Sequence, residues 1–143
     1  MNNHTDQRIC IPGDTAELVR VREFVEEMAR RCGFTEEGAY KIVIAVDEAC
    51  SNLIRHSYKL DSSRQLCIQV ETAGKTITIK IIDSGISFNP LNVPPPDMGE
   101  YFRKFMHGGL GVHIIRQLID QIEYIPADSS HPFNILKLVK SLE

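Results

Sequence analysis

Apolar and polar residues recur along the chain with two different periods, and the change of period divides it into helices and strands. Apolar residues at helical spacing predict one helix over residues 14–32 and a longer one over residues 35–58. Asp14 and Thr35 are suited to cap these two helices, and Gly33 is suited to end the first. The first half of the chain therefore reads as a pair of consecutive helices.

Strand patterns dominate the rest of the chain. β-branched and aliphatic residues alternate with polar ones over residues 65–71 and 76–82, which predicts an antiparallel hairpin. Strand patterns return at residues 122–125 and 133–139, after a third helix that begins at Leu110. We therefore expect an α/β fold, a two-layer sandwich in which helices cover one face of a mixed, mainly antiparallel sheet.

Regular patterning stops between residues 83 and 109. Four prolines exclude a long helix or a central strand there: Pro90, Pro94, Pro95 and Pro96. Loops of this length in compact domains tend to be functional. We therefore expect residues 86–108 to form a lid over a ligand site, with a short helix inside the lid.

Length and charge narrow the possible classes of protein. With 143 residues, the chain fits a single domain over residues 1–143, with a frayed segment 1–7 ahead of a short strand at residues 8–11. A net charge of −3 offers no basic surface for nucleic acid. Residues 1–7 lack the basic and apolar segments that are typical of a signal peptide, and no apolar run reaches the roughly 20 residues that span a bilayer. We expect a cytoplasmic protein without direct contact to membrane or nucleic acid.

The four cysteines are widely spaced and form no C-x-x-C pair: Cys10, Cys32, Cys50 and Cys67. A zinc site needs several cysteine or histidine ligands at close spacing, and this chain does not have them. We therefore predict buried free thiols, and neither a disulfide framework nor a zinc site.

Three polar residues recur at every fourth position inside the apolar second helix. Glu48, Asn52 and His56 fall along one stripe of that helix, because successive residues turn by about 100°. A carboxylate and a carboxamide one turn apart can share one metal-bound substrate. Polar residues at this spacing also form the solvated face of ordinary helices, and we interpret His56 as structural.

The second candidate motif is the sequence Asp83-Ser84-Gly85, at the end of a predicted strand. An aspartate that leaves a buried strand can accept a hydrogen bond from the exocyclic amine of a ligand. Gly85 would let the backbone approach a flat ring without a clash at Cβ. Together the two residues would select adenine, although Asp-x-Gly is also a common turn sequence.

Glycines gather at the start of the third predicted helix, in the sequence Gly108-Gly109-Leu110-Gly111. Free backbone N–H groups and the positive end of the helix dipole form an anion site there without a charged side chain. Phosphate groups would fit such a site. Glycines ahead of a helix are also ordinary loop residues.

These three motifs and the lid follow one another in a characteristic order. The order resembles that of the N, G1 and G2 boxes in the GHKL superfamily of ATP-binding domains, which includes histidine kinases, gyrase, the Hsp90 chaperone and MutL. The resemblance extends from about Thr35 to the C-terminus and implies the Bergerat fold. Within the superfamily, the sequences Ser-Phe-Asn-Pro and Gly-Gly-Leu-Gly-x-x-x-Ile look like bacterial anti-sigma factor serine kinases of the RsbW and SpoIIAB type.

The resemblance assigns a role to each matching residue. It implies that Glu48 is the general base, that Asn52 binds both Mg²⁺ and the nucleotide, and that Asp83 accepts the adenine amino group. Further nucleotide contacts are implied for Gly85, Phe88, Gly109, Leu110, Gly111 and Val112.

Two positions depart from the family pattern. Ser87 replaces the second glycine of Asp-x-Gly-x-Gly, and residues 129–133 replace the Gly-Thr pair expected before the last strand. Both departures concern contacts to the nucleotide, whereas Glu48 and Asn52 keep the residue types needed for phosphoryl transfer.

The resemblance implies a homodimeric serine/threonine kinase that uses ATP and Mg²⁺. Its implied substrate is an anti-anti-sigma protein of the STAS type, and its implied binding partner is a sigma factor. A nucleotide-dependent binding switch without phosphoryl transfer is the alternative that the irregular glycine positions favour. A histidine-kinase catalytic domain is a weaker alternative, because no segment reads as a phosphoacceptor helix.

Overall fold

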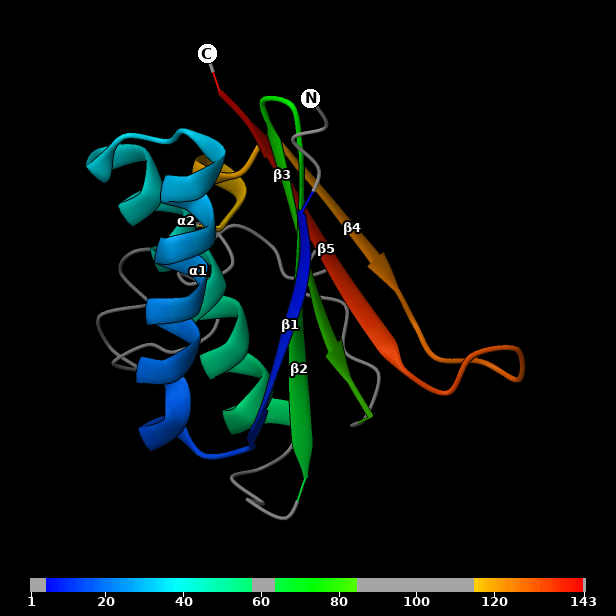
Figure 1. Cartoon of the computed structure of the whole chain (residues 1–143). Helices are drawn as coiled ribbons and strands as arrows, with labels where there is room; N and C mark the ends of the chain where they lie inside the picture. Colours follow the sequence, from blue (N-terminus) through cyan, green and yellow to red (C-terminus); the bar gives the residue numbers. More distant parts are fainter. Residues whose placement is uncertain (1–4, 58–63, 85–114, 143) are drawn as a thin grey trace, which may run out of the picture.

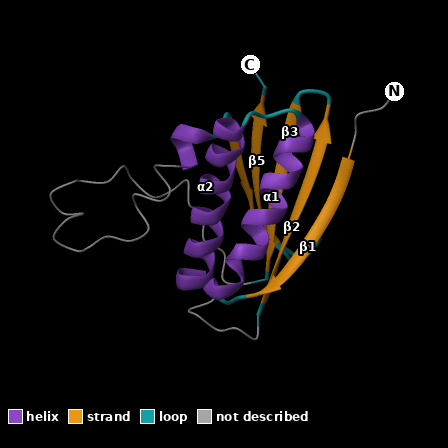
Figure 2. Cartoon of the chain, turned by 60° about the vertical axis from the view of Figure 1, so that its left-hand side comes forward, coloured by secondary structure: helices purple, strands orange, loops and turns teal. Residues whose placement is uncertain are grey.

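In the part of the chain that the structure describes, five strands form one sheet in the order β1-β2-β3-β5-β4. The structure is a computed structural model and describes residues 5–57, 64–84 and 115–142. The strands are β1 (Thr5–Pro12), β2 (Gln65–Ala73), β3 (Thr76–Asp83), β4 (Gln121–Ile125) and β5 (Asn134–Ser141). Every neighbouring pair is antiparallel, and the helices lie on one face of the sheet (Figures 1 and 2). The predicted α/β two-layer sandwich is confirmed.

Local sequence sets the bounds of the first helix. A short 3₁₀ turn, η1 (Thr15–Glu17), is capped by the side chain of Asp14 and leads into α1 (Leu18–Cys32). The helix ends at Gly33, whose φ of 113° places it in the left-handed region that glycine tolerates best. The predicted stop at Gly33 is confirmed, whereas Asp14 caps the 3₁₀ turn that precedes α1 and α1 itself begins after Glu17 without a side-chain cap.

The second helix changes its hydrogen-bond pattern near its end. α2 (Glu36–Asn52) begins after Thr35, whose hydroxyl accepts a hydrogen bond from the N–H of Gly38 at 3.1 Å. Directly after Asn52 the chain continues as a π-helical turn, η2 (Leu53–Ser57). The long helix predicted from its apolar spacing is thus a continuous helical segment whose last turn is wider. Such π turns are frequent at functional sites.

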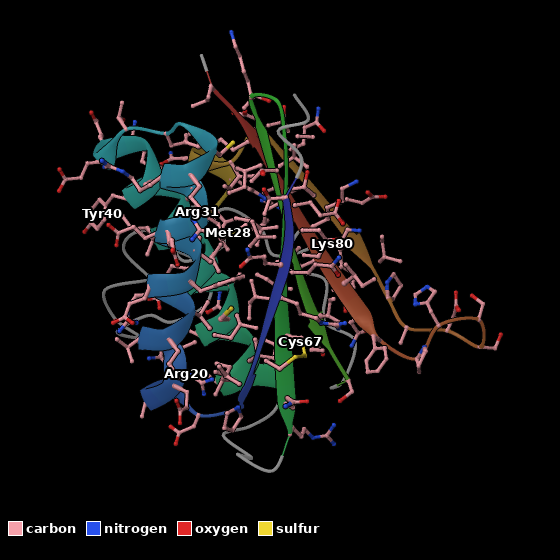
Figure 3. All side chains as sticks on the ribbon, viewed as in Figure 1. Arg20, Met28, Arg31, Tyr40, Cys67 and Lys80 are labelled. Atoms are coloured by element: carbon pink, nitrogen blue, oxygen red, sulfur yellow. A yellow bond between two sulfur atoms is a disulfide. The ribbon has the colours of Figure 1, made fainter. Side chains whose placement is uncertain are left out.

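The core lies between the helices and the sheet. Alternate residues of β2 and β3 are buried on the helix side, as their period of two predicts: Leu66, Ile68, Val70, Ile77, Ile79 and Ile81. The opposite face carries polar side chains such as Lys80, whose ammonium lies 3.5 Å from the carboxylate of Glu71 (Figure 3). This arrangement explains why the predicted hairpin has one apolar and one polar face.

Two boundaries differ from those predicted from the sequence. β1 begins at Thr5, three residues before the predicted strand, because residues 5–7 continue the antiparallel ladder with β2. Of the third predicted helix, residues 115–118 lie in the described part of the chain and are helical. None of the helices formed by residues 5–57, 64–84 and 115–142 is long and apolar enough to cross a membrane.

The prediction of four free thiols is wrong for two of them. Cys10 of β1 and Cys67 of β2 are directly opposite each other in the strand register and form a disulfide (Figure 3). They are 57 positions apart in the sequence, so their spacing alone gave no sign of the pairing. Cys50 is free and buried, as predicted, and Cys32 is free and half-buried.

Candidate nucleotide site

The end of α2 presents the two residues that the sequence singled out first. Glu48 is half-buried, and Asn52, one turn later, is only 7% exposed. The amide Nδ2 of Asn52 is buried and has no hydrogen-bond partner within the described structure. Buried amide groups almost always have partners, so a donor left without one marks a place where a ligand can supply the acceptor.

Burial and neighbouring charges change the pKa of Glu48. Partial burial raises the pKa of Glu48, the neighbouring carboxylate of Asp47 raises it further, and the guanidinium of Arg55 lowers it. Asp47 is itself held by Arg22, at 2.8 Å between Nη1 and Oδ1. A glutamate whose pKa is raised is a stronger base than an exposed one, which suits a general base.

The strand-end aspartate occupies a buried position at the border of the core. Asp83 is the last residue of β3 and is 5% exposed. The amide Nδ2 of Asn134 donates a hydrogen bond to its Oδ1 at 3.1 Å. A buried carboxylate needs donors of this kind, because an isolated charge is costly away from water.

Asp83 and the end of α2 belong to the same region of the molecule. Burial raises the pKa of the Cys50 thiol above its ordinary range, and the charges of Asp47 and then Asp83 raise it further. Cys50 lies between Glu48 and Asn52 in α2. The charge of Asp83, at the end of β3, therefore acts electrostatically on this part of the helix. The C-terminal ends of α2 and β3 also lie at the same, lower end of the molecule in Figure 1.

Several predicted site residues lie outside the described residues. They are Gly85, Phe88, Gly109, Leu110, Gly111 and Val112, together with the lid predicted over residues 86–108. Their assignment to the nucleotide stays a prediction. The described part of the site consists of the base candidate, the buried carboxamide and the strand-end aspartate.

The side chains near Asn52 suit Mg²⁺ better than metals that need several protein ligands. No group of three or more His, Cys, Asp or Glu side chains that could hold a metal ion occurs within residues 5–57, 64–84 and 115–142. Mg²⁺ commonly takes one or two oxygen ligands from the protein and the rest from substrate phosphates and water. The carboxamide of Asn52 therefore fits a Mg²⁺ that arrives with a nucleotide.

Two features of this site were not predicted from the sequence. Asn134 was not a candidate, although its place opposite Asp83 follows once the β3–β5 register is known. The π-helical turn after Asn52 was also missed, because an apolar pattern at helical spacing does not distinguish an α-helix from a single π turn.

This chain is similar to known proteins over most of its length. The family model described as histidine kinase-like ATPase domain matches residues 11–140. The serine-protein kinase RsbW of Bacillus subtilis (strain 168) is 27% identical over 128 residues, which cover 85% of this chain and 79% of that protein. The protein of the same name from Bacillus mycoides (strain KBAB4) is 29% identical over 117 residues, covering 79% of this chain and 72% of that protein.

A solved structure shares the fold. The crystal structure of the RsbU and RsbW domains of a Mycobacterium tuberculosis protein matches 96% of this chain with a TM-score of 0.65 and 17% identity. This chain spans 32% of that longer protein, and at this identity the likeness concerns the fold alone. The antiparallel sheet beneath two helices, with Asn52 and Asp83 at one end, agrees with the family match over residues 11–140. This chain therefore belongs to the family of histidine kinase-like ATPase domains.

Proposed function

We propose that this protein is a serine/threonine protein kinase that uses ATP and Mg²⁺ and acts as an anti-sigma factor. The observation that carries the proposal is the buried amide of Asn52, which has no hydrogen-bond partner among the described residues and lies one helical turn from a glutamate of raised pKa. The family match supports the use of ATP. The relatives from two Bacillus species, both named serine-protein kinases, support transfer of the phosphoryl group to a protein hydroxyl.

Recognition of the nucleotide would use the residues at the ends of α2 and β3. Asp83 would accept a hydrogen bond from the amino group of adenine, and Asn52 would face the phosphates. Asn52 would also hold Mg²⁺, which when bound reduces the negative charge of the phosphates. The Nδ2 of Asn52, which has no partner within residues 5–57, 64–84 and 115–142, would gain an acceptor from the bound nucleotide, and this removes the cost of burying it alone.

Glu48 would act on the attacking hydroxyl group. In the transfer step the serine oxygen of the substrate protein forms a bond to the γ-phosphorus, and the bond from that phosphorus to the oxygen of ADP breaks. The hydroxyl proton moves to the carboxylate of Glu48. A raised pKa favours this step, because the carboxylate holds the proton more tightly as the hydroxyl loses it.

The finer parts of the proposal come from the family resemblance. They are a substrate of the STAS anti-anti-sigma type, a sigma factor as the sequestered partner, a homodimeric state and a cytoplasmic role in transcription regulation. The names of the relatives agree with the kinase part of this assignment. The second candidate is a nucleotide-dependent switch without transfer, which the serine at position 87 favours.

The test is incubation with labelled ATP, Mg²⁺ and candidate STAS proteins from the same genome. Wild type is compared with Glu48→Gln, and Glu37→Gln serves as a matched control because that side chain is exposed at the start of the same helix. The kinase proposal expects a labelled serine on one partner, lost in Glu48→Gln and kept in Glu37→Gln.

Other results of this experiment have distinct meanings. Tight ATP binding without any labelled partner supports the switch. Equal labelling by Glu48→Gln and wild type removes Glu48 from the base role. Failure of the folded wild type to bind ATP or ADP in the presence of Mg²⁺ contradicts both functions.

A further inference from the structure

Asn134 has a single, fixed orientation beside Asp83. The two residues are directly opposite each other in the β3–β5 register, and Asn134 is only 1% exposed. Its Oδ1 accepts a hydrogen bond from the backbone N–H of Ala127 at 2.8 Å. Because an N–H can only donate, the amide must turn its oxygen toward Ala127 and its NH₂ group toward Asp83.

The turn that follows Ala127 holds this N–H in place. The carboxylate of Asp128 accepts hydrogen bonds from the N–H and the hydroxyl of Ser130, at 2.7 and 2.6 Å, and from the N–H of His131 at 3.1 Å. The N–H of Asp128 also donates to the carbonyl of His131 at 2.8 Å. The connection between β4 and β5 is thus closed on itself, which fixes the direction of the Ala127 N–H.

This orientation has a chemical consequence for Asp83. An amide NH₂ group offers donors and no acceptor, so it stabilises Asp83 as an ionised carboxylate. A carboxylate has about four acceptor positions, and the NH₂ group of Asn134 donates to one of those of Asp83. Asp83 is therefore held as an acceptor, and a protonated, donating form is disfavoured.

A carboxylate held in this way distinguishes between purines. In the pose that directs the 6-position of the base at Asp83, adenine presents an amine that can donate. Hypoxanthine and guanine present a carbonyl oxygen there, which meets the carboxylate as a second acceptor and is repelled.

We propose that Asn134 is a positioning residue that keeps Asp83 an acceptor, and that it thereby sets the preference for 6-amino over 6-oxo purine nucleotides. The chain of contacts runs from the Asp128 turn through Ala127 and Asn134 to Asp83. This inference rests on the proposed nucleotide-binding function and assigns its base specificity to a residue outside the family motifs.

The test compares ATP with ITP, which differ at the 6-position, in equilibrium binding with Mg²⁺. Wild type is expected to prefer ATP. Asn134→Ala removes the donor and is expected to lower the ATP-to-ITP preference about tenfold, because one hydrogen bond to a charged group is lost. Asp128→Ala, in an exposed turn, should change the preference in the same direction but less.

Asn134→Asp should change the pH dependence of ATP affinity, which would stay the same if Asn134 had a purely structural role. It keeps the shape and the acceptor for Ala127 but places two carboxylates in contact, which strongly raises one pKa of the pair. ATP affinity should then depend on pH between about pH 6 and pH 9, where wild type is flat. Thr72→Val is the matched control, since Thr72 is a buried polar residue on β2 at the opposite end of the sheet.

The outcomes separate this inference from the function on which it rests. An unchanged ATP-to-ITP preference in both Asn134 variants and in Asp128→Ala overturns the role of Asn134 while leaving nucleotide binding intact. A fall in preference that Thr72→Val reproduces also overturns it. If the folded wild type binds neither nucleotide, the proposed function fails, and the role of Asn134 fails with it.

Discussion

The disulfide between Cys10 and Cys67 ties the edge strand β1 to the sheet and encloses both long helices in one covalent loop. Its removal in the double variant Cys10→Ala, Cys67→Ala should destabilise the protein, because the unfolded chain gains conformational entropy that the covalent loop otherwise restricts. The two cysteines are 57 positions apart. In the chain-entropy account a loop of this length corresponds to about 4 kcal/mol.

The assay is thermal unfolding followed by circular dichroism, with and without a reductant. For a chain of this size, 1 kcal/mol shifts the melting temperature by about 2–4 °C, so the expected loss is about 8–16 °C. Reduction should lower the melting temperature of the wild type to that of the double variant and leave the variant unchanged. Cys32→Ala is the control, since Cys32 is free and only half-buried.

Counting thiols gives an independent test of the same reasoning. Unfolded but unreduced protein should expose only the thiols of Cys32 and Cys50 to a thiol reagent. If all four cysteines react and the reductant does not change the melting temperature, the strands are joined by their hydrogen-bond ladder alone. The reasoning from covalent loop closure is then refuted.

Three further predictions concern the site and the core. Because the pKa of Glu48 is raised, the base becomes deprotonated only at higher pH, and kcat/KM should rise through a midpoint above the ordinary pKa of a glutamate. Asp47→Asn should lower that midpoint, because the charge of Asp47 raises the pKa of Glu48. An unchanged pH profile would contradict this reasoning. Asn52→Leu removes a buried donor that has no partner in the part of the chain that the structure describes, so the nucleotide-free protein should melt no lower than wild type, while the stabilisation by Mg-ATP in a thermal shift assay disappears. Ile79→Ala, at a 1% exposed core position, should cost about 2–5 kcal/mol in urea unfolding. Val19→Ala, at an exposed position, should cost less than about 0.5 kcal/mol, and equal losses in the two variants would contradict the assigned core.

Much of the fold could be predicted because it depends on local patterns. The alternation in β2 and β3 predicts which residues face the core, since successive side chains of a strand point to opposite faces. The cap of the 3₁₀ turn before α1 and the cap of α2 were likewise predictable, because Asp14 and Thr35 form their capping contacts within three residues. The placement of Glu48 and Asn52 one helical turn apart in α2 was predictable for the same reason, while their roles stay predictions.

The features that were missed depend on contacts between distant parts of the chain. The partner of Cys10 follows from the β1–β2 register, and the place of Asn134 follows from the β3–β5 register. Neither register can be read from the sequence alone, because several alignments of these strands keep the same alternation of apolar residues. The sheet order, in which β5 lies between β3 and β4, depends on distant contacts in the same way.

The π-helical turn that follows Asn52 has a consequence for how this fold can vary. A π turn corresponds to one extra residue accommodated within an α-helix. Loss of a single residue from η2 would restore regular α-helical winding and rotate the exit of the helix, while the preceding turns of α2 kept their packing. Length differences at this point are therefore a means by which related domains can redirect the connection out of the helix without disturbing the carboxamide at its end.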